Sequence, residues 1–286
     1  MTLKRIIIPV NASSLKLTHC KRKYFNTVCA GLISLDERDT LDLGTAIHRV
    51  AELKTKGMPI GQIISDITYS GPNGTTLVQA ITTCPAIDPA YATELELTYD
   101  WREVVIDNVC YVIRLCLTID HIMMRSDGYV VMTDYKTTSK SKPDDVFTQY
   151  RVSVQMRFYM WVLRRFAYQL GLPAEIAEAC TLNHMFLRIH AIFKWGTPRW
   201  IMGSPITFLE SDYDEFDELM EEQLKDVILP MWSGAFPSPN GKINETCQAN
   251  YGCDFRRLCH AKNETMLAQE QLMHFTTRPY APRYTK

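Results

Sequence analysis

The feature that most constrains the fold is a pair of apolar segments, residues 109–124 and 129–136, separated by a short polar stretch. Both segments are rich in β-branched and aromatic residues, which favour strands, and Ser126-Asp127-Gly128 is typical of a turn. We therefore predict an antiparallel hairpin. Asp120 and Asp134 lie about equally far from its turn, so we expect them to pair across the two strands.

The two aspartates indicate a metal site. Like charges that face each other across a hairpin repel, so the pattern favours a cation between Asp120 and Asp134. Lys136 is two residues beyond Asp134 and therefore lies on the same face of the strand. We expect the three side chains to converge on one point.

Composition narrows the class of protein. The chain has 286 residues, 46% hydrophobic and 22% charged, as in ordinary globular domains. It contains neither the run of about 20 apolar residues that a membrane span needs nor the pattern of a secretory signal. We expect a soluble, cytoplasmic protein. A net charge of −1 gives no global basic field, so a nucleic-acid partner must be held by local patches or by metal ions.

A helix is predicted from Asp39-Thr40 to about residue 56, ended by Gly57. Within it Gly44, His48 and Glu52 are spaced by four and share one face. A lone histidine on a helix is commonly a satisfied structural residue. The neighbouring carboxylate also allows a metal-ligand role, and the helix alone does not decide between the two.

A second long amphipathic helix is predicted over residues 144–170, with Gln155 and Tyr159 four positions apart on it. The periodicity of Met156, Met160 and Leu163 indicates core positions. The remaining expected elements are helices over 15–25, 60–67 and 76–83, strands over 94–99, 104–106, 181–195 and 199–209, and a surface helix with a solvated acidic face over 212–232. We expect the last two strands to extend the sheet in an antiparallel manner.

Nine cysteines, an odd number scattered through a long chain, argue against a disulfide framework. Cys29, Cys84, Cys110, Cys116 and Cys180 are expected to be ordinary core or surface residues. Cys247, Cys253 and Cys259 follow one another at regular intervals, which indicates metal or cluster ligands. A tetrahedral thiolate site then needs a fourth sulfur from elsewhere.

Two short basic stretches are candidate nucleic-acid contacts. Lys21, Arg22 and Lys23 form a cluster that is either a solvated helix face or a set of phosphate contacts. Lys140 and Lys142 lie in the loop after the predicted hairpin.

Taken in order, these motifs resemble the PD-(D/E)XK nuclease superfamily, and within it the RecB-like branch that includes iron-sulfur exonucleases of bacteriophage and of CRISPR adaptation. Gly44-x3-His48-x3-Glu52 resembles the first helical motif and Ile119-Asp120 the first acidic motif. Asp134-Tyr135-Lys136 resembles the (D/E)XK element, and Gln155-x3-Tyr159 the helical motif that follows. The resemblance implies an α/β (α+β), restriction-endonuclease-like core, in which a central mixed β-sheet is flanked by helices.

The resemblance also implies a cysteine clasp between the two ends of the chain. Ser13-Ser14-Leu15 to Cys20 is similar to the family's N-terminal element, so Cys20 would join the three C-terminal cysteines, Cys247, Cys253 and Cys259, around a [4Fe-4S] cluster. The sequence departs from the better-known members, which place the first two C-terminal cysteines two residues apart, whereas five residues separate Cys247 and Cys253 here. Zinc is the competing occupant.

The expected organisation is a single nuclease domain over residues 1–286, with a catalytic core over 36–210. Residues 11–30 and 233–262 would form the iron-sulfur clasp, and 275–286 a loosely held tail.

The resemblance implies roles for the site residues. Mg²⁺ or Mn²⁺ would be held by His48, Asp120, Asp134 and the carbonyl group of Tyr135. Lys136 would orient or deprotonate the attacking water, and Glu52 would support the metal ligands. Gln155 and Tyr159 would position Lys136 or the DNA backbone.

The implied function is a metal-dependent DNA nuclease, an exonuclease acting on single strands or duplex ends in phage biology or in DNA recombination and repair. The alternative is a catalytically silent DNA-binding or assembly subunit with the same fold. The chain has no Gly-x4-Gly-Lys-Ser/Thr motif, so a separate helicase or recombination protein is the expected partner for unwinding.

Overall fold

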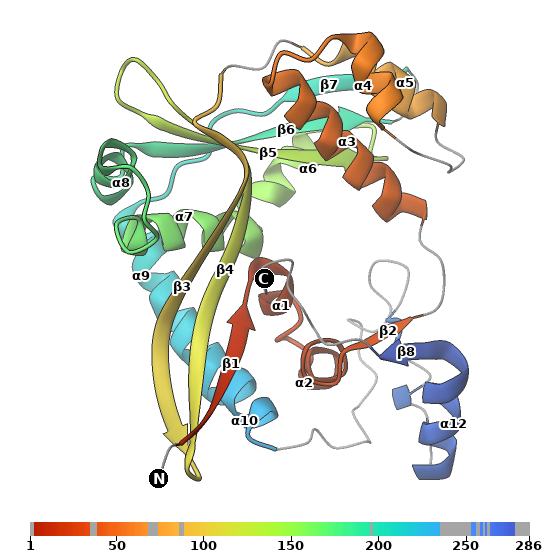
Figure 1. The fold of residues 1–286 in the computed structure, drawn as a ribbon, viewed down its shortest axis with the longest axis vertical. Coiled ribbons are helices and arrows are strands. Elements are labelled where there is room, and N and C mark those ends of the chain that lie inside the picture. Colours follow the sequence, from red (N-terminus) through yellow and green to blue (C-terminus); the bar gives the residue numbers. More distant parts are fainter. Residues whose placement is uncertain are drawn as a thin grey trace. The chain divides into compact units, whose positions relative to one another are not determined.

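The computed structural model describes residues 3–34, 39–67, 74–85, 89–194, 197–234, 253–255, 258–259, 261 and 264–277. The chain divides into two compact units (Figure 1). The terminal unit comprises residues 1–37, 100–114 and 217–286, and the hairpin unit comprises 38–99 and 115–216. The predicted metal-site residues His48, Asp120, Asp134 and Lys136 all belong to the hairpin unit.

The central sheet is mixed and has six strands. Its order is β1 (Lys4–Val10), β4 (Val109–Met124), β5 (Val130–Thr138), β6 (Met185–Phe193) and β7 (Arg199–Met202), and β3 (Ala92–Ile106) also pairs with β4. The pairs β4–β5 and β6–β7 are antiparallel, whereas β5 and β6 are parallel. The predicted mixed sheet flanked by helices is confirmed.

The two hairpin turns follow from residues that tolerate a positive φ. Gly128 has φ 83° between β4 and β5, and Asp107 and Asn108 have φ 47° and 62° between β3 and β4. The aspartate hairpin predicted over 109–136 is therefore confirmed. The two strands predicted over 94–99 and 104–106 are parts of one continuous strand, β3.

Helices cover both faces of the sheet in the hairpin unit. α3 (Asp39–Thr55), α4 (Ile60–Asp66) and α5 (Gly74–Thr83) form one apolar cluster with Ile192 of β6, against which Trp200 of β7 packs. Phe193 has the opposite parity to Ile192 and contacts Phe147 of α6 (Pro143–Arg151) at 6.1 Å between ring centroids. Because side chains alternate along a strand, α3 to α5 and α6 lie on opposite faces.

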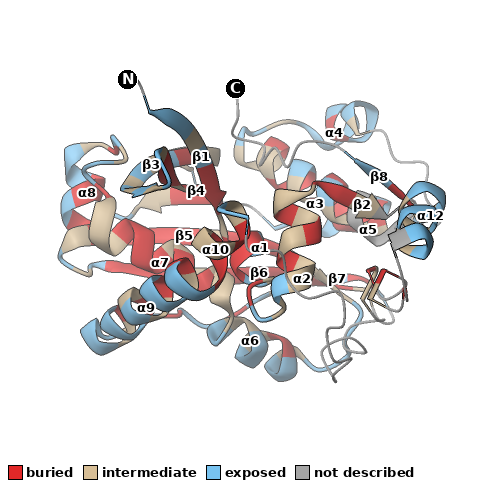
Figure 2. Cartoon of the chain, turned by 90° about the horizontal axis from the view of Figure 1, so that it is seen from below, coloured by how far each residue is buried: buried red, intermediate tan, exposed pale blue. Residues whose placement is uncertain are grey.

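The predicted helix over 144–170 is wrong in its length. The structure has α6, then α7 (Val154–Phe166), because Ser153 between them adopts an extended conformation and its hydroxyl accepts a hydrogen bond from the Met156 backbone N–H at 3.3 Å. Met156, Met160 and Leu163 are fully buried, as predicted. Figure 2 shows that α7 is largely buried, whereas α9 (Glu210–Gln223) is largely exposed.

The antiparallel extension predicted after α7 is confirmed for the pair β6–β7 and wrong for the pairing of β6 with β5. The chain forms α8 (Ala174–Thr181) and then β6, which pairs with β5 in parallel from Val130–Met185 to Thr138–Phe193. The helical connection α6 to α8 carries the chain back to the start of β5, which parallel pairing requires. β7 is four residues long and ends at Met202 instead of Leu209.

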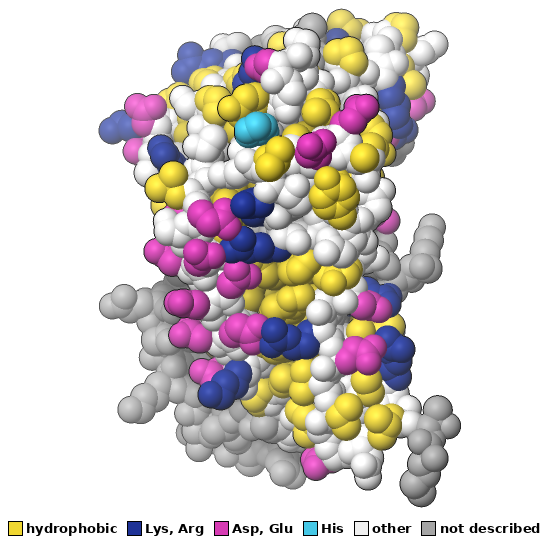
Figure 3. All heavy atoms as spheres, turned by 90° about the vertical axis from the view of Figure 1, so that its left-hand side faces the viewer, with side chains coloured by type: hydrophobic (Ala, Val, Ile, Leu, Met, Phe, Trp, Pro, Cys, Tyr) yellow, Lys and Arg dark blue, Asp and Glu magenta, His cyan; other side chains and the backbone are white. Residues whose placement is uncertain are grey.

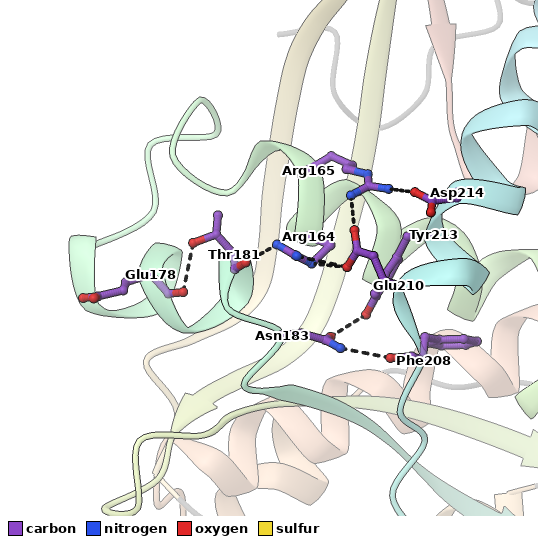
Figure 4. A network of polar contacts seen from close by, with 9 residues as sticks. All are labelled: Arg164, Arg165, Glu178, Thr181, Asn183, Phe208, Glu210, Tyr213 and Asp214. Carbon is purple, nitrogen blue, oxygen red and sulfur yellow. Dashed lines mark hydrogen bonds and ion pairs between the residues drawn. The ribbon is translucent and has the colours of Figure 1, made fainter.

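The other predicted helices differ in detail. In place of the single helix predicted over 15–25, the structure has α1 (Ala12–Leu15), α2 (Lys21–Tyr24) and a π-helical turn η1 (Phe25–Cys29). The acidic helix predicted over 212–232 consists of α9, a π-helical turn η2 (Leu224–Ile228) and α10 (Leu229–Trp232). Part of its acidic face is ion-paired, since Arg164 and Arg165 of α7 contact Glu210, and Arg165 contacts Asp214 (Figure 4).

On the face of the molecule shown in Figure 3, acidic side chains gather along one side, and basic side chains lie next to several of them. The basic side chains beside them agree with the ion pairs of α7 and α9.

Asn183, between α8 and β6, joins this network (Figure 4). It has φ +60°, its Nδ2 donates to the Phe208 carbonyl at 3.0 Å, and its Oδ1 accepts from the Tyr213 hydroxyl at 2.8 Å.

We expect Asn183→Ala to lower the free energy of unfolding by about 3 kcal/mol. Alanine loses both hydrogen bonds, and unlike asparagine it has no polar side chain that offsets the cost of a left-handed backbone conformation. Asn183→Gly should cost about 1 kcal/mol less, since glycine adopts this φ freely. Urea denaturation measures the free energy of unfolding of both variants. Equal losses in the two variants would contradict the claim that backbone strain contributes to the cost of Asn183→Ala.

In the terminal unit, segments from both ends of the chain lie together. β2 (Leu32–Ser34) pairs antiparallel with β8 (Phe275–Thr277), which follows α12 (Glu264–His274). Leu32, Phe255, Leu258 and Phe275 form a buried cluster against which Cys253 packs. Arg22 of α2 donates to the Leu258 carbonyl at 2.8 Å. β8 includes the first residues of the segment predicted as a loose tail.

Among the described residues, no helix is long and apolar enough to span a bilayer.

Candidate active site

The two aspartates lie where β4 and β5 separate. The antiparallel ladder ends at His121–Thr133, one residue before Asp120 and Asp134 would pair. Asp120 Oδ2 instead accepts the Tyr135 backbone N–H at 2.7 Å. Both carboxylates are buried, with Asp120 9% and Asp134 3% exposed. The end of the ladder thus leaves two buried acidic groups near each other at the fork.

His48 of α3 reaches the first of these carboxylates. Its Nδ1 lies 3.4 Å from Asp120 Oδ1 and 3.9 Å from Glu94 Oε1. One potential metal-ligating atom from each of these three residues lies within 4.8 Å of the others, and this is the one such group of three or more found in the part of the chain that the structure describes. We refer to His48, Glu94 and Asp120 as the ligand triad.

Beside the ligand triad, Asp134 is held by two side chains. Lys136 Nζ lies 2.5 Å from Asp134 Oδ2, and Gln155 Nε2 of α7 donates to Asp134 Oδ1 at 3.1 Å. Gln155 Nε2 also lies 3.2 Å from the Tyr159 hydroxyl. The structure therefore brings the predicted residues Asp134, Lys136, Gln155 and Tyr159 into one connected group.

Charge within the site shifts the protonation of its members. Burial alone would lower the pKa of His48, but Asp120 and Glu94 outweigh it and raise that pKa to about 10. Burial and the nearby charge of Asp120 raise the pKa of Asp134, which Lys136 opposes. Burial disfavours the charged form of Lys136, yet Asp134 and Asp120 raise its pKa above the usual value. The carboxylates of the site thus stabilise positive charge on the side chains beside them.

Tyr150 of α6 also faces this group, with its ring centroid 5.9 Å from Lys136 Nζ. The ring is half-buried. A cation above an aromatic ring is attracted by the ring's quadrupole, so Tyr150 helps to fix where the ammonium group lies.

Glu52 lies outside the ligand triad. Its carboxylate is engaged by Arg49 Nη1 at 2.7 Å and by Lys56 Nζ at 2.6 Å on the same helix. Although Glu52 follows His48 by one helical turn, these two cations occupy its oxygens.

The basic residues have separate surroundings. Lys140 Nζ donates to Gln149 Oε1 at 2.7 Å, and Lys142 is exposed at the N-cap of α6. Lys21 is exposed, whereas Arg22 and Lys23 are half-buried.

Of the predicted cluster cysteines, Cys247 lies outside the described residues. Cys20 is the N-cap residue of α2, and Cys20, Cys253 and Cys259 are each half-buried. Among the residues that the structure describes, these three do not form a ligand group as close as the ligand triad. Of the five cysteines expected to be ordinary core or surface residues, Cys29 is half-buried and the other four are buried, namely Cys84, Cys110, Cys116 and Cys180.

Sequence reasoning missed Glu94 as a site residue. Glu94 begins an alternating stretch, Glu94-Leu-Glu-Leu, which resembles an ordinary half-buried strand, and Glu96 has the same parity. What distinguishes Glu94 is its backbone, which has φ +48°, an uncommon value for a non-glycine residue. Such strain clusters at functional sites, but it is visible only in the structure.

Among the comparisons with known proteins, the match to a family model supports the resemblance at the level of the superfamily. The solved structure of SSO0001 aligns with 15% sequence identity and a TM-score of 0.27, covering 78% of this chain and 96% of that one. No curated protein matches the chain. The family model of the PD-(D/E)XK nuclease superfamily matches residues 10–260. The chain therefore belongs to the PD-(D/E)XK nuclease superfamily, and this membership implies metal-dependent nuclease activity on DNA.

Proposed function

We propose that the protein is a Mg²⁺- or Mn²⁺-dependent deoxyribonuclease of the RecB-like branch, an exonuclease that acts on single-stranded DNA or duplex ends. The observation that carries the proposal is the ligand triad, a half-buried imidazole and two carboxylates, lying beside the Asp134–Lys136 ion pair. Phage-encoded DNA processing or DNA recombination and repair would use such an activity, with a separate helicase or recombination protein as the partner.

The donor set fits a hard divalent cation. Carboxylate oxygens suit Mg²⁺ and Mn²⁺, and the imidazole nitrogen adds affinity for Mn²⁺. The ligand triad would hold the ion together with Asp134 and the Tyr135 carbonyl group. When bound, the ion would supply a Lewis acid for the scissile phosphate and lower the pKa of a water molecule.

The chain's own residues would arrange the reaction around that ion. Lys136, held by Asp134, would direct positive charge toward the phosphate and orient the attacking water. Gln155 would fix Asp134 through its 3.1 Å hydrogen bond, and Tyr159 would in turn fix Gln155. Tyr150 would limit the movement of the Lys136 ammonium group.

The proposed contacts to the DNA backbone are basic side chains outside this group. Arg and Lys contacts to phosphates supply affinity without sequence preference. The candidates are Lys21, Arg22, Lys23, Lys140 and Lys142.

A time course on DNA labelled at the 5′ or the 3′ end tests the function. The protein is incubated with single-stranded and duplex substrates in Mg²⁺, in Mn²⁺ or in EDTA. Release of short labelled products from one end only, abolished by EDTA, supports an exonuclease and gives its polarity. Internal fragments would contradict the exonuclease assignment. Binding of DNA without any cleavage would instead support a silent assembly subunit.

Glu94→Gln tests the ligand triad independently of cleavage. We expect Mn²⁺ affinity, measured by calorimetry, to fall about tenfold or more, because a neutral amide replaces a charged oxygen ligand. Glu96→Gln, two residues along the same strand and exposed, is the matched control and should leave the affinity unchanged. An unchanged affinity in Glu94→Gln would remove this residue from the site.

We also propose an iron-sulfur clasp in the terminal unit, formed by Cys20, Cys247, Cys253 and Cys259, with zinc as the competing occupant. Two contacts in that unit support it: β2 pairs with β8, and Arg22 binds the carbonyl of Leu258, next to Cys259. Sulfur ligands suit either occupant. The clasp over 11–30 and 233–262 would be structural, joining the two ends of one nuclease domain around a core over 36–210.

Cys253→Ala tests the clasp. We expect the variant to lose absorbance near 400 nm and to unfold at a lower temperature, since a structural cluster contributes folding energy directly. Cys29→Ala, a half-buried cysteine of the same unit outside the proposed ligand set, should keep the absorbance. A colourless wild-type protein that contains zinc would favour the zinc site. A Cys253→Ala variant with unchanged stability would contradict the clasp altogether.

A further inference from the structure

An aromatic and cationic patch lies in the hairpin unit, away from the residues assigned so far. It consists of Tyr129, His184, Phe186, Arg125 and Arg188, which we call the aromatic patch. Tyr129 is 40% exposed and its ring lies 5.4 Å from that of His184, which is also exposed, at an interplanar angle of 32°. The two rings therefore present adjoining aromatic surfaces to solvent.

The base of the patch is Phe186, which is 7% exposed and lies under two guanidinium groups. Arg188 Cζ lies 5.2 Å and Arg125 Cζ 5.9 Å from the Phe186 ring centroid. Arg125 also pairs with Asp127 at 2.7 Å, so two arginines and one aspartate leave the charged groups of the patch net positive. Cations held on an aromatic ring keep their outward N–H groups available to acceptors.

The register places this patch on the sheet face that carries α3, the helix of His48, whereas Asp134 and Lys136 have the opposite parity. Phe186 and Arg188 pair with Val131 and Thr133 of β5, and so share a face with Tyr135, the next residue of that parity. The Tyr135 ring lies 6.4 Å from His48 of the ligand triad. In Figure 1, β6 extends well past α3 toward α8, so the helix that carries His48 covers only part of this face.

We infer that the aromatic patch binds single-stranded DNA a few nucleotides away from the reacting phosphate. Exposed rings stack on bases of any sequence, and arginines contact phosphates, which is how proteins hold single strands without sequence readout. This inference rests on the proposed nuclease function for its substrate. Tyr135 lies six positions after Tyr129, which is about 20 Å along a strand, or about six nucleotides at stacked spacing.

Fluorescence anisotropy with labelled oligothymidylates in EDTA tests the inference, because binding is then measured without cleavage. We expect Tyr129→Ala to weaken binding of a twelve-nucleotide strand by about tenfold. Tyr129→Phe, which keeps the ring, should bind within about twofold of the unaltered protein. Tyr168→Ala removes a tyrosine that is 55% exposed elsewhere in the hairpin unit and should change nothing.

The arginines give a second readout. Arg188→Gln should reduce the slope of log affinity against log salt by about one unit, as expected for the loss of one phosphate contact. Strands of about four nucleotides, too short to reach from the ligand triad to the patch, should show no difference in Mn²⁺-dependent cleavage between Tyr129→Ala and the unaltered protein.

Three results would overturn the inference: no binding of the twelve-nucleotide strand by the unaltered protein, equal binding by Tyr129→Ala, or an equal loss for a duplex of the same length. Equal binding is also what a patch serving a protein partner would give. Failure of the nuclease function is a separate outcome. An unaltered protein that never cleaves, yet binds the strand through Tyr129, supports the patch and contradicts the nuclease.

Discussion

Asp120→Asn is expected to lower Mn²⁺-dependent DNA cleavage at least about a hundredfold, a loss typical of removing one preorganised electrostatic group. Asp120 belongs to the ligand triad through its 3.4 Å contact with His48, and its second oxygen accepts the Tyr135 N–H. Asparagine can keep a similar shape and accept the Tyr135 hydrogen bond, but it lacks the negative charge that attracts a divalent cation. Initial rates on a labelled single strand measure the effect.

Three further measurements separate catalysis from folding. Circular dichroism should show an unchanged fold, and DNA binding in EDTA should remain close to that of the unaltered protein. Added Mn²⁺ should raise the melting temperature of the unaltered protein but not of Asp120→Asn, because only an occupied site stabilises the native state. Asp107→Asn, in the exposed turn between β3 and β4, is the matched control and should cleave normally. Cleavage at an undiminished rate in Asp120→Asn would contradict the assignment.

Lys136→Met is expected to lower cleavage by a similar factor, about a hundredfold or more, through a different cause. Methionine keeps much of the aliphatic stem of Lys136 but removes the charge that would face the phosphate. We expect kcat to fall with little change in Mn²⁺ affinity, because Lys136 is not a metal ligand. Single-turnover cleavage together with calorimetry distinguishes this from the loss of a ligand.

The lysine variant has its own controls. Lys136→Arg keeps the positive charge and should retain more activity than the methionine variant, although its guanidinium group differs in shape from the ammonium group. Lys225→Met, an exposed lysine of the terminal unit, should leave the rate unchanged. If Lys136→Met lost Mn²⁺ binding as completely as Asp120→Asn, the role proposed for the lysine would be wrong.

The parts of the site that the sequence predicts are those encoded over short distances. The Asp134-Tyr135-Lys136 element and the turn at Gly128 follow from strand alternation and turn chemistry, and the observed hairpin agrees with both. The helix bearing His48 was predictable from its N-terminal residues and its end at Gly57. The superfamily follows from the order of these motifs, each of which is weak alone.

Long-range geometry was not predictable in the same way. The parallel pairing of β6 with β5 depends on how the α6 to α8 connection folds back, and the break at Ser153 depends on one hydroxyl capping the next helix. Glu94 lies in the ligand triad and has a positive φ, while Glu96, with the same chemistry and alternation, lies outside the triad. Local patterns carry no information that separates these two glutamates.

The most direct test of the central claim is a Mn²⁺ titration in which bound metal, followed by electron paramagnetic resonance, and the cleavage rate are measured on the same preparation. The account predicts that occupancy and rate saturate at the same Mn²⁺ concentration, and that Asp120→Asn loses both. A rate that does not follow occupancy, or Mn²⁺ binding that is unchanged in Asp120→Asn, would contradict a catalytic metal site at His48, Glu94 and Asp120.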